Sequence, residues 1–502
     1  MMLDFASQAD YFWALLPEIV LSLAAMLVLL VDVFQKGNRS EPSRPIIGWL
    51  ALAGVVVATA ANVWIGDLTE TGAAGMVAVD QFRIFTNYIF LLVAALSIML
   101  SIGYLERHGM NLGEYFVLLM FSTVGMMLMA SARDLILLFL ALELMSVAIY
   151  VLVGFNRRDA RSAEGALKYF MLGAFSSGFL LYGIALVFGS TGSTNLAVIA
   201  PLLDGGLAGE SLMFLIGAAL ILTGLGFKVA AVPFHAWTPD VYEGAPTPIT
   251  GFMATGVKAA AFAAFIRVFA VAFEGVYLQW ASVIWWLAVA TMVGANLVAL
   301  TQGSVKRMLA YSSIAHAGYL LVALVSANSY GAAAFLFYLV VYTLMTIGAF
   351  GMVIANERGE KERVTLQDYA GLGWQQPMVG AFFSIFLISL AGFPLTGGFI
   401  GKVYILKGAL DSGLSVLAVI LVVSSLVSYF YYLRVVVVMY MQPASSQDAH
   451  SGMVLSAPAR IALGVAAIAV LVLFFYPGPL LDAAQHSVAS LFPDQGFLVG
   501  RP

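Results

Sequence analysis

The chain has 502 residues, of which 62% are hydrophobic and 10% are charged, and its formal net charge is −4 at pH 7. Soluble domains average about 45–50% apolar and about 25% charged residues, so the composition excludes a water-soluble protein and favours a bundle of membrane helices. The chain has no cysteine, which excludes disulfides, cysteine-ligated zinc and iron–sulfur clusters. No basic cluster is large enough to bind nucleic acid.

A membrane helix needs about 20 mostly apolar residues. Such runs occur at 11–34, 46–66, 82–105, 113–131, 134–155, 164–189, 211–236, 247–273, 278–301, 305–326, 330–355, 378–405, 412–441 and 455–476. No Lys or Arg precedes the first run, which is too long for the apolar part of a signal peptide, so we expect it to be retained. The expected fold class is an all-α integral membrane protein with about fourteen transmembrane helices.

The basic residues predict the orientation of these spans. Most follow odd-numbered spans: Lys36, Arg39, Arg44, Arg107, Arg157, Arg158, Arg161, Lys306, Arg307, Arg358, Lys361, Arg363 and Arg460. Cytoplasmic loops are enriched in Lys and Arg, so both termini are expected on the periplasmic side of a bacterial inner membrane. We expect segment 190–210 on the outer surface, segment 237–248 as a loop near the outer side with solvated acids, and the tail 477–502 as irregular chain.

Two spans carry helix-breaking residues beside a lysine. Pro233 follows Lys228 in the seventh span, and Pro394 with four glycines precedes Lys402 in the twelfth. Proline and glycine are common in membrane helices, but paired breaks five spans apart are typical of transporters built from inverted repeats. The predicted units are the N-terminal helices 1–110 (spans 1–3), a first repeat 111–275 (spans 4–8), a second repeat 276–442 (spans 9–13), and a C-terminal helix and tail 443–502.

Ionisable groups inside the bilayer are costly and are therefore functional candidates. Glu143 lies nine residues beyond Asp134, about 13.5 Å along its helix, which is near mid-membrane. A protonated carboxyl that packs between helices is the structural alternative for Glu143. Lys258 also lies near mid-depth. Lys228 and Lys402 flank the two breaks, where a lysine can also neutralise the exposed carbonyls of a helix end.

Three further candidates have structural explanations of comparable weight. His316 lies near mid-depth of the tenth span, where a neutral histidine bonded to a backbone carbonyl explains it as well as a relay does. Lys168 is one or two turns inside the sixth span, and extension to the cytoplasmic surface explains it, although it can still tune the site electrostatically. His235 either extends the relay or caps the break after Lys228.

These seven residues together predict a proton relay. Desolvation disfavours the charged form of a lysine, and a nearby carboxylate favours it. An intact Glu143–Lys228 pair would hold Lys228 charged, and a broken pair would let it release its proton. Moving one proton against 100 mV costs about 2.3 kcal/mol, which a change driven elsewhere can supply without a cofactor in this chain.

Three segments carry a resemblance to a known family: Asp134–Phe155, Phe227–Pro248 and Gly392–Lys402. They resemble the antiporter-like N subunits of bacterial respiratory complex I, the NADH:quinone oxidoreductase, and are similar to mitochondrial subunit 2. The resemblance covers nearly the whole chain. The loop after Lys228 is specific to antiporter-like subunits, and the segment around Glu143 favours the N type.

The resemblance implies a proton-translocating subunit that holds no redox cofactor. FMN, iron–sulfur clusters and quinone would be bound by partner subunits, and the partners would be the antiporter-like M subunit, the small K-, J- and A-type subunits, and membrane lipids. It further implies that Glu143 and Lys228 form the coupled pair, that Lys258 links to the second half-channel, and that Lys402 governs the outer exit. The sister M subunit usually has a glutamate at the position of Lys402.

Other functions remain open on the sequence. A subunit of an Mrp-type cation/proton antiporter would use the same charges. A structural scaffold with vestigial charges has no reason to retain the cost of so many ionisable groups at mid-membrane. A quinone-reducing enzyme would need a set of redox ligands that the sequence lacks.

Overall fold

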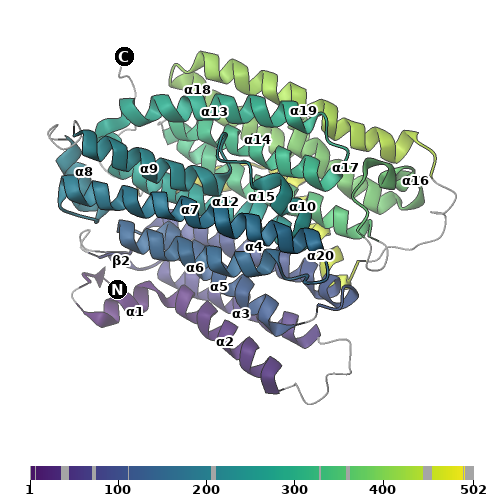
Figure 1. Ribbon diagram of the computed structural model, residues 1–502, viewed down its shortest axis with the longest axis horizontal. Helices are drawn as coiled ribbons and strands as arrows, with labels where there is room; N and C mark the ends of the chain where they lie inside the picture. The colour runs from purple at the N-terminus through teal and green to yellow at the C-terminus, as the bar shows by residue number, and fades with distance from the viewer. Residues whose placement is uncertain are drawn as a thin grey trace.

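Thirteen helices among the described residues are long and apolar enough to cross a membrane, and the broken pair α17 (Pro377–Ala391) and α18 (Gly397–Asp411) forms one further span. The computed structural model describes residues 2–5, 7–34, 45–70, 75–110, 112–204, 211–326, 329–357, 362–444, 455–489 and 491. The spans lie side by side, with α2 (Leu16–Phe34) and α3 (Pro45–Ile65) along one side and α18 and α19 (Ser415–Met441) along the opposite side (Figure 1). The expected all-α membrane fold is confirmed.

The other spans are joined by two short strands and several short helices. In the first half these elements are β1 (Met2–Leu3), α1 (Gln8–Ala14), β2 (Thr69–Glu70), α4 (Gln81–Arg107), α5 (Gly113–Ser131), α6 (Leu135–Val153), α7 (Ala160–Thr191), α8 (Leu196–Asp204), α9 (Leu212–Val229), α10 (Thr238–Gly244), α11 (Thr247–Phe252) and α12 (Lys258–Phe265). In the second half they are α13 (Tyr277–Ala299), α14 (Val305–Ser326), α15 (Ser329–Ala355), α16 (Leu372–Gln375), α20 (Ala457–Phe475) and α21 (Gly478–Ala489). The two strands pair in parallel.

Burial divides the spans into a central and a peripheral set. In α14 and α15, 94% of the apolar stretch is buried inside the protein, and in the span Thr247–Ala272 the share is 89%. The same share is 33% for α2 and 39% for α13 and α19. Charged side chains on the central helices are therefore removed from lipid as well as from water.

The segments that follow odd-numbered spans meet at one end of the bundle, here named the odd end. Glu362, which follows α15, accepts a hydrogen bond from Tyr104 in α4 at 3.4 Å. The same carboxylate accepts hydrogen bonds from Thr247 and Lys306, each at 3.0 Å. One acidic side chain therefore joins the third, eighth, tenth and eleventh spans, as the charge pattern of the loops predicts.

The segments that follow even-numbered spans meet at the opposite end, the even end. Asp80, which precedes α4, accepts two hydrogen bonds of 2.9 Å from Arg267 near the end of the eighth span. Asp134 and Asn195 form a backbone bridge between the segments that precede α6 and α8. This regular alternation of ends agrees with the count of fourteen spans.

Both predicted helix breaks are confirmed. The seventh span stops at Val229, where Ala230 has a φ of 61°, and the chain continues through turns to α10. The twelfth span stops at Ala391, where Gly392 has a φ of 83°, and resumes as α18. The division into two inverted repeats at the expected boundaries stays a prediction.

The eighth span is less regular than expected. Its α-helical parts α11 and α12 alternate with π-helical segments at Met253–Val257 and Ile266–Ala272. π-Helical turns are rare and occur often at functional sites. Here they flank Lys258, and no local sequence pattern predicts them.

Segment 237–248 corrects one expectation. It is not a loop, because Thr238–Gly244 forms α10 at the odd end, and its acids are paired: Asp240 accepts hydrogen bonds from Lys168 and Arg307, each at 2.8 Å. Glu243 pairs with Arg307 at 2.9 Å. The segment follows the seventh span, so its acids meet the basic residues of the neighbouring odd-numbered connections.

The expectation of irregular chain over 477–502 is also wrong, because Gly478–Ala489 forms α21, which packs against α4 and α15. Pro479 lies in the first turn of this helix, where its missing N–H costs nothing. Residues 492–502 and the predicted cytoplasmic residues Lys36, Arg39, Arg44, Arg358 and Lys361 lie outside the described residues.

Candidate functional site

α14 carries a line of polar side chains through the middle of the protein. Ser313, His316 and Tyr319 follow one another at intervals of three residues, which sets them on one face of the helix. Each of the three is only 1% exposed. Buried polar groups need hydrogen-bond partners, and these partners come from α12, α15 and α19 for Ser313 and His316 and from Asn296 of α13 for Tyr319.

Lys258 binds at one end of this line. Its ammonium group donates to the carbonyl oxygen of Ser313 at 2.7 Å and to the Ser313 hydroxyl at 2.5 Å. The Tyr342 hydroxyl of α15 donates to the same hydroxyl oxygen at 3.0 Å. Lys258 is 1% exposed, and among the described residues no carboxylate pairs with it. A buried charge without a counter-ion is costly, so a change in these contacts can release its proton.

His316 occupies the middle of the line with both ring nitrogens facing hydroxyl groups. Nδ1 lies 2.7 Å from the hydroxyl of Tyr338, and Nε2 lies 3.2 Å from the hydroxyl of Tyr432. Ser312 is hydrogen-bonded to Tyr432 as well. The partners are therefore hydroxyls and not the backbone carbonyl of the structural alternative. An imidazole in this setting can accept a proton on one nitrogen and release one from the other.

Lys402 lies at the far end of the line, beside the second helix break. Its ammonium group donates to the carbonyl oxygens of Leu390 at 3.0 Å and Ala391 at 2.8 Å, the last residues of α17. The same group lies 4.8 Å from the centre of the Tyr319 ring. Lys402 therefore caps a broken helix and also contacts the polar line of α14.

Lys228 forms a separate site at the first helix break. Its ammonium group donates to the Ser146 hydroxyl at 2.8 Å and to the Tyr150 hydroxyl at 3.4 Å, both on α6. It lies 5.4 Å from the centre of the Tyr169 ring on α7, a distance at which a cation is attracted to an aromatic face. Lys228 is 1% exposed.

Glu143 differs from the lysines because it is only half-buried. It accepts a hydrogen bond from Ser177 of α7, and Leu140, Leu144 and Val147 are exposed around it on α6. Ser146, one turn further along α6, is the residue that bonds to Lys228. Glu143 lies on α6 and Lys228 on α9; the two are linked through Ser146 of α6, and the two side chains do not bond to each other directly.

Two predicted residues lie apart from these groups. Lys168 pairs with Glu164 at 2.6 Å and Asp240 at 2.8 Å at the odd end, and its side chain is 40% exposed. Its side chain thus extends to the protein surface at that end, and its electrostatic role stays a prediction. His235 lies half-buried in the turns after Lys228, and its Nδ1 has no hydrogen-bond partner among the described residues.

The sequence did not single out the hydroxyl groups that connect these charges. They are Ser146, Tyr150, Ser313, Tyr338, Tyr342 and Tyr432. Serine and tyrosine are ordinary residues of membrane helices, so no single position stands out. The three-residue spacing of Ser313, His316 and Tyr319 is the one signal that could have identified a polar face.

Comparison with known proteins identifies the family. Residues 132–428 match the family described as NADH:quinone oxidoreductase/Mrp antiporter, TM. The NADH-quinone oxidoreductase subunit N of Trichlorobacter lovleyi is 46% identical over 474 residues, which cover 94% of this chain and 96% of that protein. This chain belongs to the N-subunit family. Subunit N 1 of Solibacter usitatus is 43% identical over 479 residues, which cover 95% of this chain and 97% of that protein.

Solved structures agree with this membership. A chain of respiratory complex I from Thermus thermophilus superposes with a TM-score of 0.78 at 35% identity, covering 94% of this chain and 100% of that chain. A chain of the Mrp complex from Dietzia sp. DQ12-45-1b gives a TM-score of 0.83 at 21% identity, covering 97% of this chain and 98% of that chain. The likeness to the Mrp complex is a likeness of fold, whereas the relationship to N subunits extends along nearly the whole sequence.

Proposed function

We propose that this chain carries protons across the membrane as the N subunit of NADH:quinone oxidoreductase, through Lys228, Lys258, His316 and Lys402. The observation that carries the proposal is the line on α14. Ser313 bonds to Lys258. Tyr319 lies six residues further along α14, about 9 Å away, and its ring contacts Lys402. Hydroxyl and imidazole groups between two buried amines form a route along which a proton can move by short transfers.

Glu143 is the group through which we expect the neighbouring subunit to act. A carboxylate at mid-membrane surrounded by exposed leucine and valine side chains would be costly if it faced lipid. A partner subunit that covers this face of α6 would shield the Glu143 carboxylate from lipid. A change in that partner would alter the charge near Lys228 through Ser146 and the adjacent turn of α6.

The charge pattern of the connections supports a proposal for the orientation of the chain in the membrane, and family membership supports one for its partners. We expect the odd end in the cytoplasm and both termini in the periplasm of a bacterial inner membrane, because the basic connections lie at the odd end. FMN, iron–sulfur clusters and quinone would reside in partner subunits, and the M, K, J and A-type subunits would be neighbours. Lys168 and His235 would have supporting roles, electrostatic for Lys168 and at the helix break for His235.

The decisive experiment is Lys228→Ala in the assembled complex reconstituted in sealed vesicles, with NADH:quinone turnover and proton uptake recorded together. Loss of both rates in an intact complex is the expected result, because the buried amine cannot be replaced by alanine. Lys407→Ala is the matched control, since Lys407 is an exposed lysine of α18 that contacts the Tyr330 ring. Normal rates for Lys228→Ala would contradict the proposal and favour a structural scaffold.

A further inference from the structure

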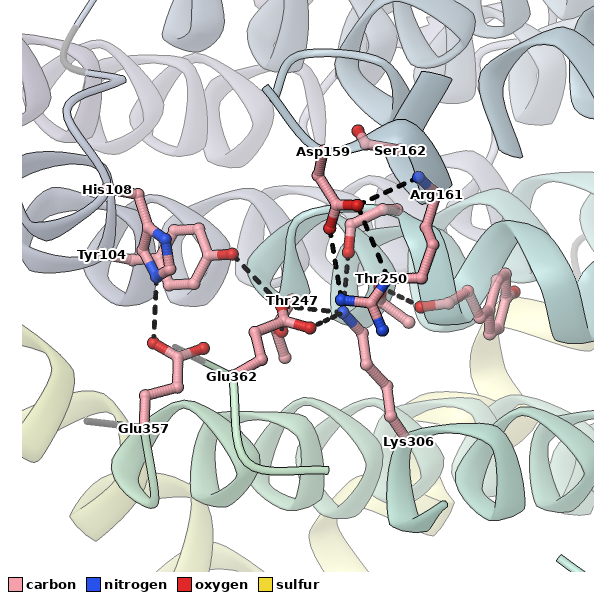
Figure 2. Close-up of polar contacts among 12 residues, drawn as sticks. Tyr104, His108, Asp159, Arg161, Ser162, Thr247, Thr250, Lys306, Glu357 and Glu362 are labelled. Carbon is pink, nitrogen blue, oxygen red and sulfur yellow. Dashed lines mark hydrogen bonds and ion pairs between the residues drawn. The ribbon is translucent and has the colours of Figure 1, made fainter. Parts of the chain in front are cut away.

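The odd end contains a buried cluster of titratable groups that the relay above does not use. Glu357, whose side chain is 0% exposed, accepts hydrogen bonds from His108 and Arg107, each at 3.3 Å. Its other carboxylate oxygen, Oε1, has no hydrogen-bond partner among the described residues. Figure 2 shows Glu357 directed toward His108, and Glu362 directed toward Lys306.

The two acids of this cluster have different surroundings. Glu362 lies 3.0 Å from the ammonium group of Lys306, which is fully buried and donates to the carbonyl oxygen of Ala245 as well. Burial raises the pKa of the Glu357 carboxyl above its ordinary value, although the hydrogen bond from His108 opposes the change. Glu357 is therefore the acid of the pair whose protonation can vary.

Buried hydroxyl groups continue from this cluster toward Lys258. The Tyr242 hydroxyl of α10 faces Ser313 and Tyr342, and the Thr346 hydroxyl of α15 lies one turn from Tyr342 on the side toward the odd end. Tyr242 is 0% exposed and Thr346 is 4% exposed, and the two hydroxyls lie near Ser313 and Tyr342 without forming a hydrogen bond of ordinary distance and angle among the described residues. Buried hydroxyls of this kind are usually satisfied by ordered water, which also conducts protons.

The helix geometry connects the two regions. Lys306 and Ser313 are seven residues apart on α14, so they lie on one face about 10.5 Å from each other. α10 spans the same interval, because Ala245 directly after it binds Lys306 while its Tyr242 hydroxyl faces Ser313. The Tyr242 and Thr346 hydroxyls therefore lie between the acidic cluster and the ammonium group of Lys258.

We propose that Glu357 and Glu362 form the proton-collecting site of the odd end, and that protons pass from it to Lys258 along the Thr346 and Tyr242 hydroxyls. The inference rests on the proposed function and names the entry to its second half. A proton from bulk water enters past Glu362, whose side chain is 15% exposed, and protonates the buried Glu357 carboxylate, and the acid then gives that proton inward to the free amine of Lys258. The carboxylate is regenerated, and no oxidant or reductant takes part.

The test uses Glu357→Gln in the assembled complex in sealed vesicles, with proton uptake measured at pH 6 and pH 8. Glutamine resembles the protonated carboxyl, so the variant is expected to assemble. We expect uptake to fall about tenfold at pH 8, where bulk protons are scarce, and to recover toward the unmodified rate at pH 6. Glu106→Gln is the matched control, because Glu106 is an exposed acid of α4 at the same end. Equal rates for the two variants at both pH values would overturn the proposal.

Two smaller changes keep the proposal testable if Glu357→Gln does not assemble. Tyr242→Phe and Thr346→Val remove only the hydroxyl groups, and each is expected to slow proton uptake severalfold without loss of the complex. Unchanged uptake in both would overturn the route. Lys258→Ala separates this inference from the proposed function: normal uptake with Lys258→Ala contradicts the function itself, whereas its loss together with normal uptake in Glu357→Gln contradicts only the collecting site.

Discussion

Lys258 donates two hydrogen bonds to Ser313, at 2.7 Å to its carbonyl oxygen and at 2.5 Å to its hydroxyl. The hydroxyl is the part of this contact that a mutation can remove. A hydrogen bond to a charged group contributes about 1.5–3 kcal/mol, so Ser313→Ala should lower coupled proton uptake by about tenfold while the carbonyl bond keeps Lys258 in position. Proton uptake by reconstituted complex at matched protein content measures the effect.

Ser326→Ala is the control for that change. Ser326 lies on the same helix, and among the described residues its hydroxyl bonds only to the carbonyl oxygen of Val322 in the preceding turn. It should leave uptake unchanged. If Ser313→Ala and Ser326→Ala behave alike in complexes of equal stability, the Ser313 hydroxyl carries no protons and the line on α14 is structural.

The partners of Lys228 predict an order of effects. Ser146 accepts a hydrogen bond of 2.8 Å from the ammonium group, whereas Tyr150 accepts a longer one of 3.4 Å and also offers its ring at 5.5 Å. Ser146→Ala should therefore slow NADH:quinone turnover more than Tyr150→Phe, which keeps the aromatic contact. The ratio of the two turnover rates, each normalised to the amount of assembled complex, is the measurement. The reverse order would mean that Tyr150, and not Ser146, is the more important partner of the Lys228 ammonium group.

Lys228 and Lys402 illustrate how much of the site could be predicted from the sequence. A lysine beside proline or glycine in an apolar run stands out, so both helix breaks and the lysines beside them can be predicted from the sequence, whereas the role of these lysines in proton transfer stays a prediction. Tyr432 could not be found, because it approaches His316 from 116 residues away in an ordinary apolar helix. Asp240 was misjudged because its loop looked polar and solvated, and its ion pairs with Lys168 and Arg307 depend on how the odd-numbered connections pack together.

Gly392 has a backbone role beside Lys402 that a substitution can test. Its φ of 83° is the left-handed conformation, and a Cβ at this position would lie 2.7 Å from Cδ of Lys402. Gly392→Ala should destabilise the subunit by about 1–2 kcal/mol and displace the lysine. We expect a lower Tm together with slower proton uptake. Gly464→Ala, a helical glycine whose Cβ would meet nothing within 4 Å, should leave both unchanged or raise Tm slightly. An unaltered Tm for Gly392→Ala would contradict the argument that alanine is strained at this position.

The Asp80–Arg267 pair predicts a dependence of stability on pH at the even end. Burial alone would raise the pKa of Asp80, but the charge and hydrogen bonds of Arg267, together with the N–H of Arg83 and the charge of Arg133, outweigh it and hold the pKa below the ordinary value of 3.8. A carboxyl with a depressed pKa contributes stability above its unfolded pKa, and that contribution is lost as the pH falls through the folded pKa. The Tm of the detergent-solubilised protein should therefore drop more steeply below about pH 4 than the Tm of Asp80→Asn.

Asp80→Asn isolates this pair because asparagine also serves as an N-cap, and Asp80 caps α4 through the N–H of Arg83 at 2.8 Å. At neutral pH the variant leaves a buried guanidinium unpaired, since the two side chains are only 8% and 12% exposed, and we expect it to cost about 3 kcal/mol or more. Arg267→Ala should cost a similar amount, and the double variant should cost less than the sum of the two, because each single change leaves one charge buried alone. Strictly additive losses of stability would mean that the two residues act independently, and the pH dependence would then need another origin.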